Sequence, residues 1–223
     1  MDTGIDSVIA RMEAIDGELP RHDGVAYFNR LYLQVTRAVL TASANTTFED
    51  PAFIETLDVV FAGLYFDAEA TVASRAPCPV AWLPMVQDRA EAIAPIQFAL
   101  AGMNAHIGHD LALAVVQTCE QLAIDLSDDS PQHRDFETVN GLLDQVEGQV
   151  AGWFETGLIA DIEDVTTQSV ARALSMWSIV AARDIAWGHA EILWALRNEP
   201  RMSAIYADTL ARAVELSSRG ILI

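Results

Sequence analysis

Residues 104–111 of the chain read NAHIGHDL, which places two histidines and an aspartate within five positions. Apolar, helix-like sequence lies on both sides, over residues 96–103 and 111–122. A titratable cluster in such surroundings must be hydrogen-bonded, ion-paired or bound to a metal, because burying a bare charge is costly. The stretch therefore predicts a central helical element that carries a polar site.

Two local geometries are open for this stretch. On a continuous helix, His106, His109 and Asp110 share one face, since they are three and four positions apart. With a break at Gly108, the first helix ends near Ile107 and Asp110 is the N-cap of the next one. Both geometries bring an imidazole and a carboxylate together, so the predicted histidine–aspartate site does not depend on the choice.

Composition limits the classes of function. Hydrophobic residues make up 52% of the 223 residues, and the mean hydropathy is +0.22, which indicates a thick interior, an oligomer interface or an apolar cavity. The formal net charge is −19, and all 13 basic residues are arginines. Without lysine, Schiff-base chemistry and a phosphate-loop lysine are excluded. The acidic balance argues against nucleic-acid partners and anionic membrane surfaces.

The chain carries no obvious targeting signal. Its first residues lack the basic and apolar regions of a signal peptide. Cys78 and Cys119 lack metal-like spacing, which indicates reduced thiols in a cytoplasmic protein. Residues 173–196 are as apolar as a membrane span, but they contain Arg183, Asp184, His189 and Glu191. We therefore expect a buried helix of a soluble protein there.

Apolar periodicity and capping signals predict an all-α fold. Asp50–Pro51 and Ser130–Pro131 each pair an N-cap with proline at the first helical position. The pattern predicts a bundle of about eight helices, with one between Asp23 and the polar loop at 43–47. The others span residues 7–19, 51–73, 95–107, 111–124, 131–154, 164–197 and 200–217. No strand pattern, repeat or linker divides the chain, so residues 1–223 are expected to form one domain.

One carboxylate stands out in the third expected helix. Between residues 57 and 66, only Asp58 and the hydroxyl of Tyr65 are polar, which predicts a central helix with a buried aspartate. An arginine such as Arg30 is one candidate partner for that charge. Tyr65 lies seven positions after Asp58, on the same helix face, so it is expected to line any pocket beside Asp58.

Six residues are candidate metal ligands, drawn from four or five expected helices: His106, His109, Asp110, Asp58, His133 and Asp184. Helix bundles build metal sites from side chains that project inward from facing helices. Mixed carboxylate and imidazole ligation suits iron, manganese or zinc. The alternatives are structural: Asp110 as a cap, Asp58 in an ion pair, His109 and His133 at the surface, or a metal-free polar network.

Several blocks resemble those of a small bacterial all-α family, and the resemblance covers nearly the whole chain. The blocks are residues 98–107 continuing to Asp110–Leu111, Asp58–Phe61 with Tyr65–Phe66, and His133 with Asp135–Phe136 and Val139–Asn140. That family includes a non-haem di-iron monooxygenase that hydroxylates a diterpenoid intermediate in antibiotic biosynthesis. The resemblance implies a helical bundle with a dinuclear iron site. It matches Asp58, His106, Asp110 and His133, whereas His109 and Asp184 come from spacing alone.

We therefore expect O2-dependent hydroxylation of a small, largely apolar substrate at a dinuclear iron site, with zinc or manganese as alternative metals. Tyr65 is expected in the substrate pocket. One alternative is a dinuclear hydrolase, in which the metals lower the pKa of bound water. Another is a non-catalytic binding protein with a structural polar centre. The apolar composition is also consistent with a homo-oligomer.

Overall fold

The computed structural model describes residues 4–74, 76–161 and 178–223, and every regular element within these ranges is helical. The α-helices are α1 (Ile5–Glu18), α2 (Gly24–Ser43), α3 (Pro51–Ser74), α4 (Leu83–Asp88), α5 (Pro95–Ala105), α6 (Leu111–Leu122), α7 (Pro131–Glu147), α8 (Val150–Glu155), α10 (Ile179–Ala195) and α11 (Pro200–Ile221). A short 3-10 helix, η1 (Val80–Trp82), precedes α4, and a π-helical segment, η2 (His106–Asp110), joins α5 to α6. The predicted all-α bundle is confirmed.

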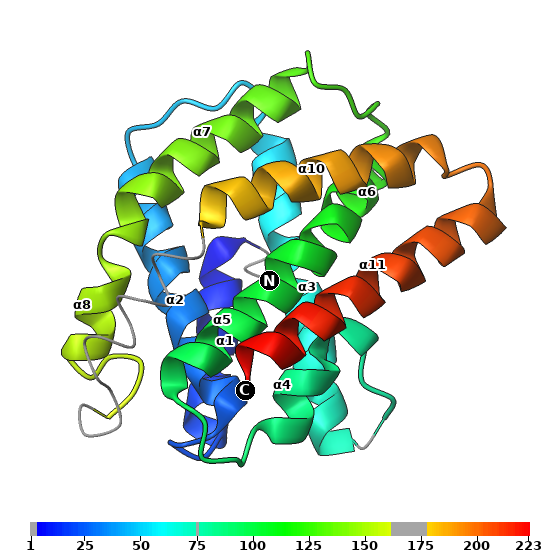
Figure 1. Ribbon diagram of the computed structural model, residues 1–223. Coiled ribbons are helices and arrows are strands. Elements are labelled where there is room, and N and C mark those ends of the chain that lie inside the picture. Colours follow the sequence, from blue (N-terminus) through cyan, green and yellow to red (C-terminus); the bar gives the residue numbers. More distant parts are fainter. Residues whose placement is uncertain (1–3, 75, 162–177) are drawn as a thin grey trace.

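The two helices around the NAHIGHDL stretch run through the middle of the bundle (Figure 1). Helices α2 and α11 pack on α5, while α3 and α10 pack on α6. Nearly every residue of α5 is buried, as its apolar composition on all sides requires. Helix α6 ends at Ala123, which has a left-handed φ of 53° and whose backbone N–H reaches the carbonyls of Cys119 and Glu120.

Side-chain caps explain several helix starts, and other helix ends differ from those expected from the sequence. Asp23 and Ser130 cap α2 and α7 with their side chains, as expected. The first helix begins at Ile5 with Gly4 as its N-cap, two residues before the start expected at residue 7. The helix expected over 131–154 is divided into α7 and α8 at residues 148–149. The last helix continues to Ile221. Residues 162–177, which include the expected start of the long helix at 164, lie outside the described residues.

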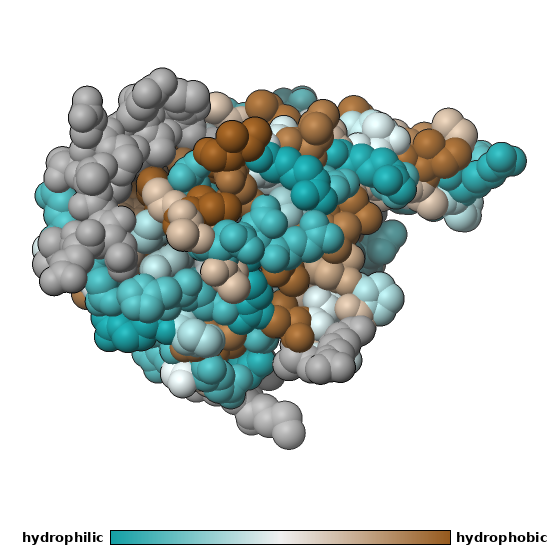
Figure 2. Space-filling view, turned by 60° about the horizontal axis from the view of Figure 1, so that its bottom comes forward, coloured by the Kyte–Doolittle hydropathy of each residue, from teal (hydrophilic) through white to brown (hydrophobic). Residues whose placement is uncertain are grey.

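Hydrophobic and hydrophilic residues are interspersed on the face drawn in Figure 2, where the connection from α10 to α11 projects from the body of the molecule. Five large apolar side chains of these two helices are exposed: Ile185, Ile192, Met202, Ile205 and Leu216. Within the described residues, no helix combines the length and the apolarity needed to span a membrane.

Candidate functional site

The π-helical segment decides between the two geometries that the sequence left open. The backbone stays helical from α5 through η2 into α6, and the N–H of Leu111 bonds the carbonyl of His106, five residues earlier. The Asp110 side chain makes no capping hydrogen bond. The continuous helix is therefore correct and the cap interpretation is wrong. A π turn adds one residue to the helical turn, a feature that is frequent at functional sites.

Asp110 is the centre of a buried hydrogen-bond cluster. Its Oδ1 accepts a hydrogen bond from Nδ1 of His109 at 2.7 Å. Its Oδ2 accepts from the indole Nε1 of Trp82 at 2.9 Å and from Nδ1 of His106 at 3.3 Å. Burial alone would raise the pKa of Asp110, but the hydrogen bonds from His106 and His109 keep that pKa below its ordinary value. Asp110 is therefore ionised and accepts at both oxygens.

The hydrogen bond to Asp110 determines the tautomer of the His106 imidazole. A carboxylate only accepts hydrogen bonds, so Nδ1 of His106 carries the proton and Nε2 of the neutral ring has a free lone pair. Burial lowers the pKa of His106, which outweighs the opposing effect of Asp110 and keeps the ring neutral. Nε2 is fully buried and has no hydrogen-bond partner among the described residues. Such an atom is costly to leave unpaired, which marks it as a binding group.

Aromatic rings hold the His106 imidazole in place. The ring of Phe61 lies flat against it, with centroids 3.6 Å apart and planes 3° apart. The rings of Tyr32 and Phe28 pack against it edge-on, at centroid distances of 4.7 Å and 5.9 Å. Because the imidazole cannot rotate without displacing these rings, the direction of its Nε2 lone pair is fixed.

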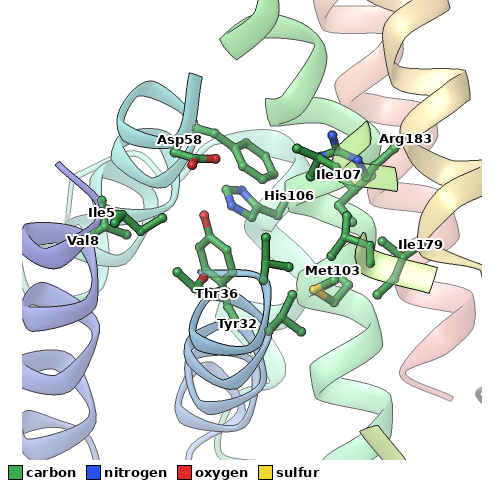
Figure 3. Close-up of a pocket in the computed structure, with 15 residues that line it drawn as sticks. Ile5, Val8, Tyr32, Thr36, Asp58, Met103, His106, Ile107, Ile179 and Arg183 are labelled. Atoms are coloured by element: carbon green, nitrogen blue, oxygen red, sulfur yellow. The ribbon is translucent and has the colours of Figure 1, made fainter. Parts of the chain in front are cut away.

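His106 lines a small cavity of about 80 Å³ between α2, α3, η2 and α10. Figure 3 shows the phenol of Tyr32, the carboxylate of Asp58 and the imidazole of His106 directed toward the same part of it. Arg183 is the remaining charged group in the wall. The apolar wall includes Ile5, Val8, Val35, Val39, Phe61, Met103, Ile107, Val139, Leu143 and Ile179. Including Thr36, five polar side chains line an otherwise apolar cavity, and a few polar groups among apolar ones are typical of a small-molecule site.

Asp58 lines this cavity together with Arg183, and the charges of the two side chains act on each other. Burial raises the pKa of Asp58 to about 6, and the positive charge of Arg183 only partly offsets that effect. The partner suggested by the sequence, Arg30, instead donates from Nε to Asp16 at 2.5 Å. Burial, with Asp58 as the next contribution, raises the pKa of Tyr32, so its phenol stays protonated at neutral pH.

A second, outer pocket of about 480 Å³ adjoins the cavity. Four residues line both spaces: Ile5, Val39, Asp58 and Val139. The outer pocket also includes the carboxylates of Asp6 and Glu55. Asp58 therefore lies in the wall of both spaces, and His106 lines only the first.

The structure brings together four of the six predicted ligands. Asp58 and His106 line the cavity, whereas Asp110 and His109 lie behind His106. His133 lies elsewhere: it stacks on Trp187 at 4.5 Å, and its Nδ1 is 2.7 Å from the carbonyl of Asp128.

Two further expectations need correction. Asp184 was placed on the buried seam of its helix, but it is exposed and accepts a hydrogen bond from Asn140 at 2.8 Å. Tyr65 was expected in the pocket, but it lies in the core, where its hydroxyl donates to Asn29 at 3.1 Å. Sequence reasoning did not select Arg183 and Tyr32 as site residues, but these two side chains line the cavity, whereas Asp184 and Tyr65 do not. Tyr32 falls on the apolar seam of its helix, which was the one available signal.

Taken together, the fold and the site define an all-α bundle with a cavity lined by a histidine and a carboxylate. Within the described ranges, no three His, Cys, Asp or Glu side chains form a group that could hold a metal ion. The model of a family of unknown function, DUF5995, matches residues 5–223, and the chain belongs to that family. Comparison with curated proteins and with solved structures gave no match.

Proposed function

We propose that the cavity around His106 and Asp58 is the iron centre of a non-haem oxygenase, dinuclear as the family resemblance implies, that hydroxylates a small, largely apolar molecule. The observation that carries this proposal is Nε2 of His106. It is buried, it has no hydrogen-bond partner in the part of the chain that the structure describes, and its ring lines a cavity that also contains a carboxylate. Imidazole and carboxylate are both ligands that iron accepts.

The role of Asp110 supports a metal at this position. Histidines that bind metals commonly donate their other ring N–H to a carboxylate, which fixes the tautomer and raises the basicity of the ligating nitrogen. Asp110 gives His106 this arrangement, and Trp82 holds Asp110. His106 and Asp58 are fewer than the roughly six protein ligands of a dinuclear carboxylate centre in a helix bundle. The iron stoichiometry is therefore part of the test.

The remaining residues of the cavity have roles that suit oxidation of an apolar molecule. Bound iron would supply the activation of O2, which no side chain can provide. The aliphatic and aromatic wall excludes water from the reacting groups. The protonated phenol of Tyr32, directed toward the same space as His106, can donate a hydrogen bond or a proton there.

Metal analysis of protein expressed with added iron and purified without oxygen tests the proposal. We expect about two iron ions per chain, lost in His106→Ala and retained in His189→Ala. His189 is a matched control because it lies on α10, where its Nδ1 is 2.7 Å from the hydroxyl of Tyr206, and it does not line the cavity. Folded wild-type protein that binds no more iron than His106→Ala would overturn the proposal. Zinc with hydrolytic turnover would point to a hydrolase instead.

A further inference from the structure

Arg183 is a buried cation whose hydrogen-bonding capacity is mostly unused. It is 6% exposed, yet no carboxylate of the described residues lies within ion-pairing distance of its guanidinium. Its Nε donates to Oδ1 of Asn140 at 2.6 Å, and neither Nη atom has a hydrogen bond to any described residue. By contrast, Arg30 and Arg89, which are also largely covered, each pair with an aspartate.

The surrounding residues hold the guanidinium in a fixed position. One face lies 4.0 Å above the ring centroid of Phe136, and the Nε edge is occupied by Asn140. The Nη edge is left free, and Arg183 lines the cavity that contains His106. A guanidinium held in this way is prepared for an oxyanion, which it can bind through two parallel N–H···O bonds.

The negative charges near Arg183 offset its charge only from a distance. Asn140 donates from Nδ2 to Asp184 at 2.8 Å and to Glu137 at 3.3 Å, so these two carboxylates contact the amide and act on the guanidinium only by their charge. Asp58 is the strongest favourable charge on Arg183, but it lies across the cavity. If Asp58 binds a metal cation, as the proposed function requires, Arg183 loses its strongest compensating charge, and burying a poorly compensated charge is costly.

The geometry points to Arg183 as the binding group for the carboxylate of the substrate, which we infer to be a largely apolar monocarboxylic acid. The inner cavity accommodates the carboxylate and the first carbons, and the chain continues past Asp58 into the outer pocket. This binding mode places carbons remote from the carboxylate beside His106. The inference shares the cavity with the proposed function, but the binding step itself needs no metal.

Binding of three eight-carbon probes to protein treated with a chelator tests this inference. Octanoate, 1-octanol and octylamine differ only in their head group. We expect octanoate to bind wild-type protein at least about tenfold more tightly than 1-octanol, as hydrogen bonds to a charged group would give. Arg183→Gln should abolish that preference. Arg197→Gln should keep it, since Arg197 lies over Trp194 at the surface and does not line the cavity.

Two further measurements cover the case in which Arg183→Gln does not fold. Arg183→Lys keeps the charge but not the two parallel donors, so octanoate should bind it more weakly than wild-type protein. In wild-type protein, carbon NMR of carboxyl-labelled octanoate should show that binding lowers the pKa of its carboxyl group. Wild-type protein that binds octanoate no better than 1-octanol would overturn the inference, as would an unchanged preference in folded Arg183→Gln. Because these experiments use metal-free protein, their failure is separate from a failure to bind iron.

Discussion

The indole nitrogen of Trp82 donates to Oδ2 of Asp110 at 2.9 Å, and the same oxygen accepts a hydrogen bond from His106. Trp82 belongs to η1, which packs against α11 and lies 28 residues before Asp110 in the chain. The direction of the His106 ring therefore depends on a short segment outside the helix that carries it. This dependence makes Trp82 a useful probe of the site.

Replacing Trp82 with phenylalanine should lower the free energy of unfolding by about 1.5–3 kcal/mol, because the ionised Asp110 loses one of its three hydrogen bonds in a buried setting. Urea denaturation followed by circular dichroism measures the effect. Trp194→Phe is the control, since its indole nitrogen makes no hydrogen bond to any described residue and its ring lies beside Arg197. Equal losses in the two variants would show that the Trp82–Asp110 bond contributes nothing.

Asp110→Asn should weaken metal binding about 10- to 100-fold, because the amide lacks the charge that makes Nε2 of His106 basic. Competition with a chromophoric chelator for zinc or cobalt measures the affinity. Asp135→Asn is the matched control: Asp135 is equally buried, but it accepts from the backbone N–H groups of Glu49 and Asp50, away from the cavity. That variant should lose stability and keep the metal affinity. Equal metal affinities in both variants would contradict the role assigned to Asp110.

Local spacing was sufficient to predict the histidine–aspartate contact. The four-residue separation of His106 and Asp110 brings their side chains together on a helix, and the apolar flanks required a central position. The π turn was not predictable in the same way, because one extra residue in a turn leaves no distinct mark in an apolar pattern. As a result, Asp110 bonds both imidazoles and is not a cap.

The choice between Arg183 and Asp184 shows the limit of such reasoning. Adjacent residues of a helix point about 100° apart, so a small error in the phase of the seam exchanges them. The sequence analysis placed Asp184 inside the bundle, as a candidate metal ligand. In the structure the arginine is buried, because Phe136 of α7 packs against its guanidinium and Asn140 of α7 accepts a hydrogen bond from its Nε. That contact joins residues more than 40 positions apart, and helical periodicity does not encode it.

The close approach of α2 to α5 gives a stability prediction. A Cβ atom on Gly102 would lie 2.4 Å from the ring of Phe28, which is fully buried against Tyr65 and His106. Gly102→Ala should therefore destabilise the fold by about 1–3 kcal/mol. Gly63→Ala, also within a helix, meets no atom within 4 Å and should stabilise it by about 0.5–1 kcal/mol. Thermal unfolding distinguishes the two, and a similar stability change in both variants would contradict the packing argument.

The raised pKa of Asp58, about 6 against an ordinary 3.8, predicts how stability depends on pH in metal-free protein. Between about pH 4 and pH 6 the folded state holds a proton on Asp58 that the unfolded chain has released. Stability contributed by this group is therefore present below about pH 4 and is lost as the pH rises through about 6.

Asp58→Asn removes the titration, so its stability relative to wild-type protein should increase by up to about 3 kcal/mol between pH 4 and pH 7. Urea denaturation at a series of pH values measures this difference, with Asp67→Asn, exposed on the same helix, as the control. A difference between Asp58→Asn and wild-type protein that stays constant over this range would show that folding does not raise the pKa of Asp58.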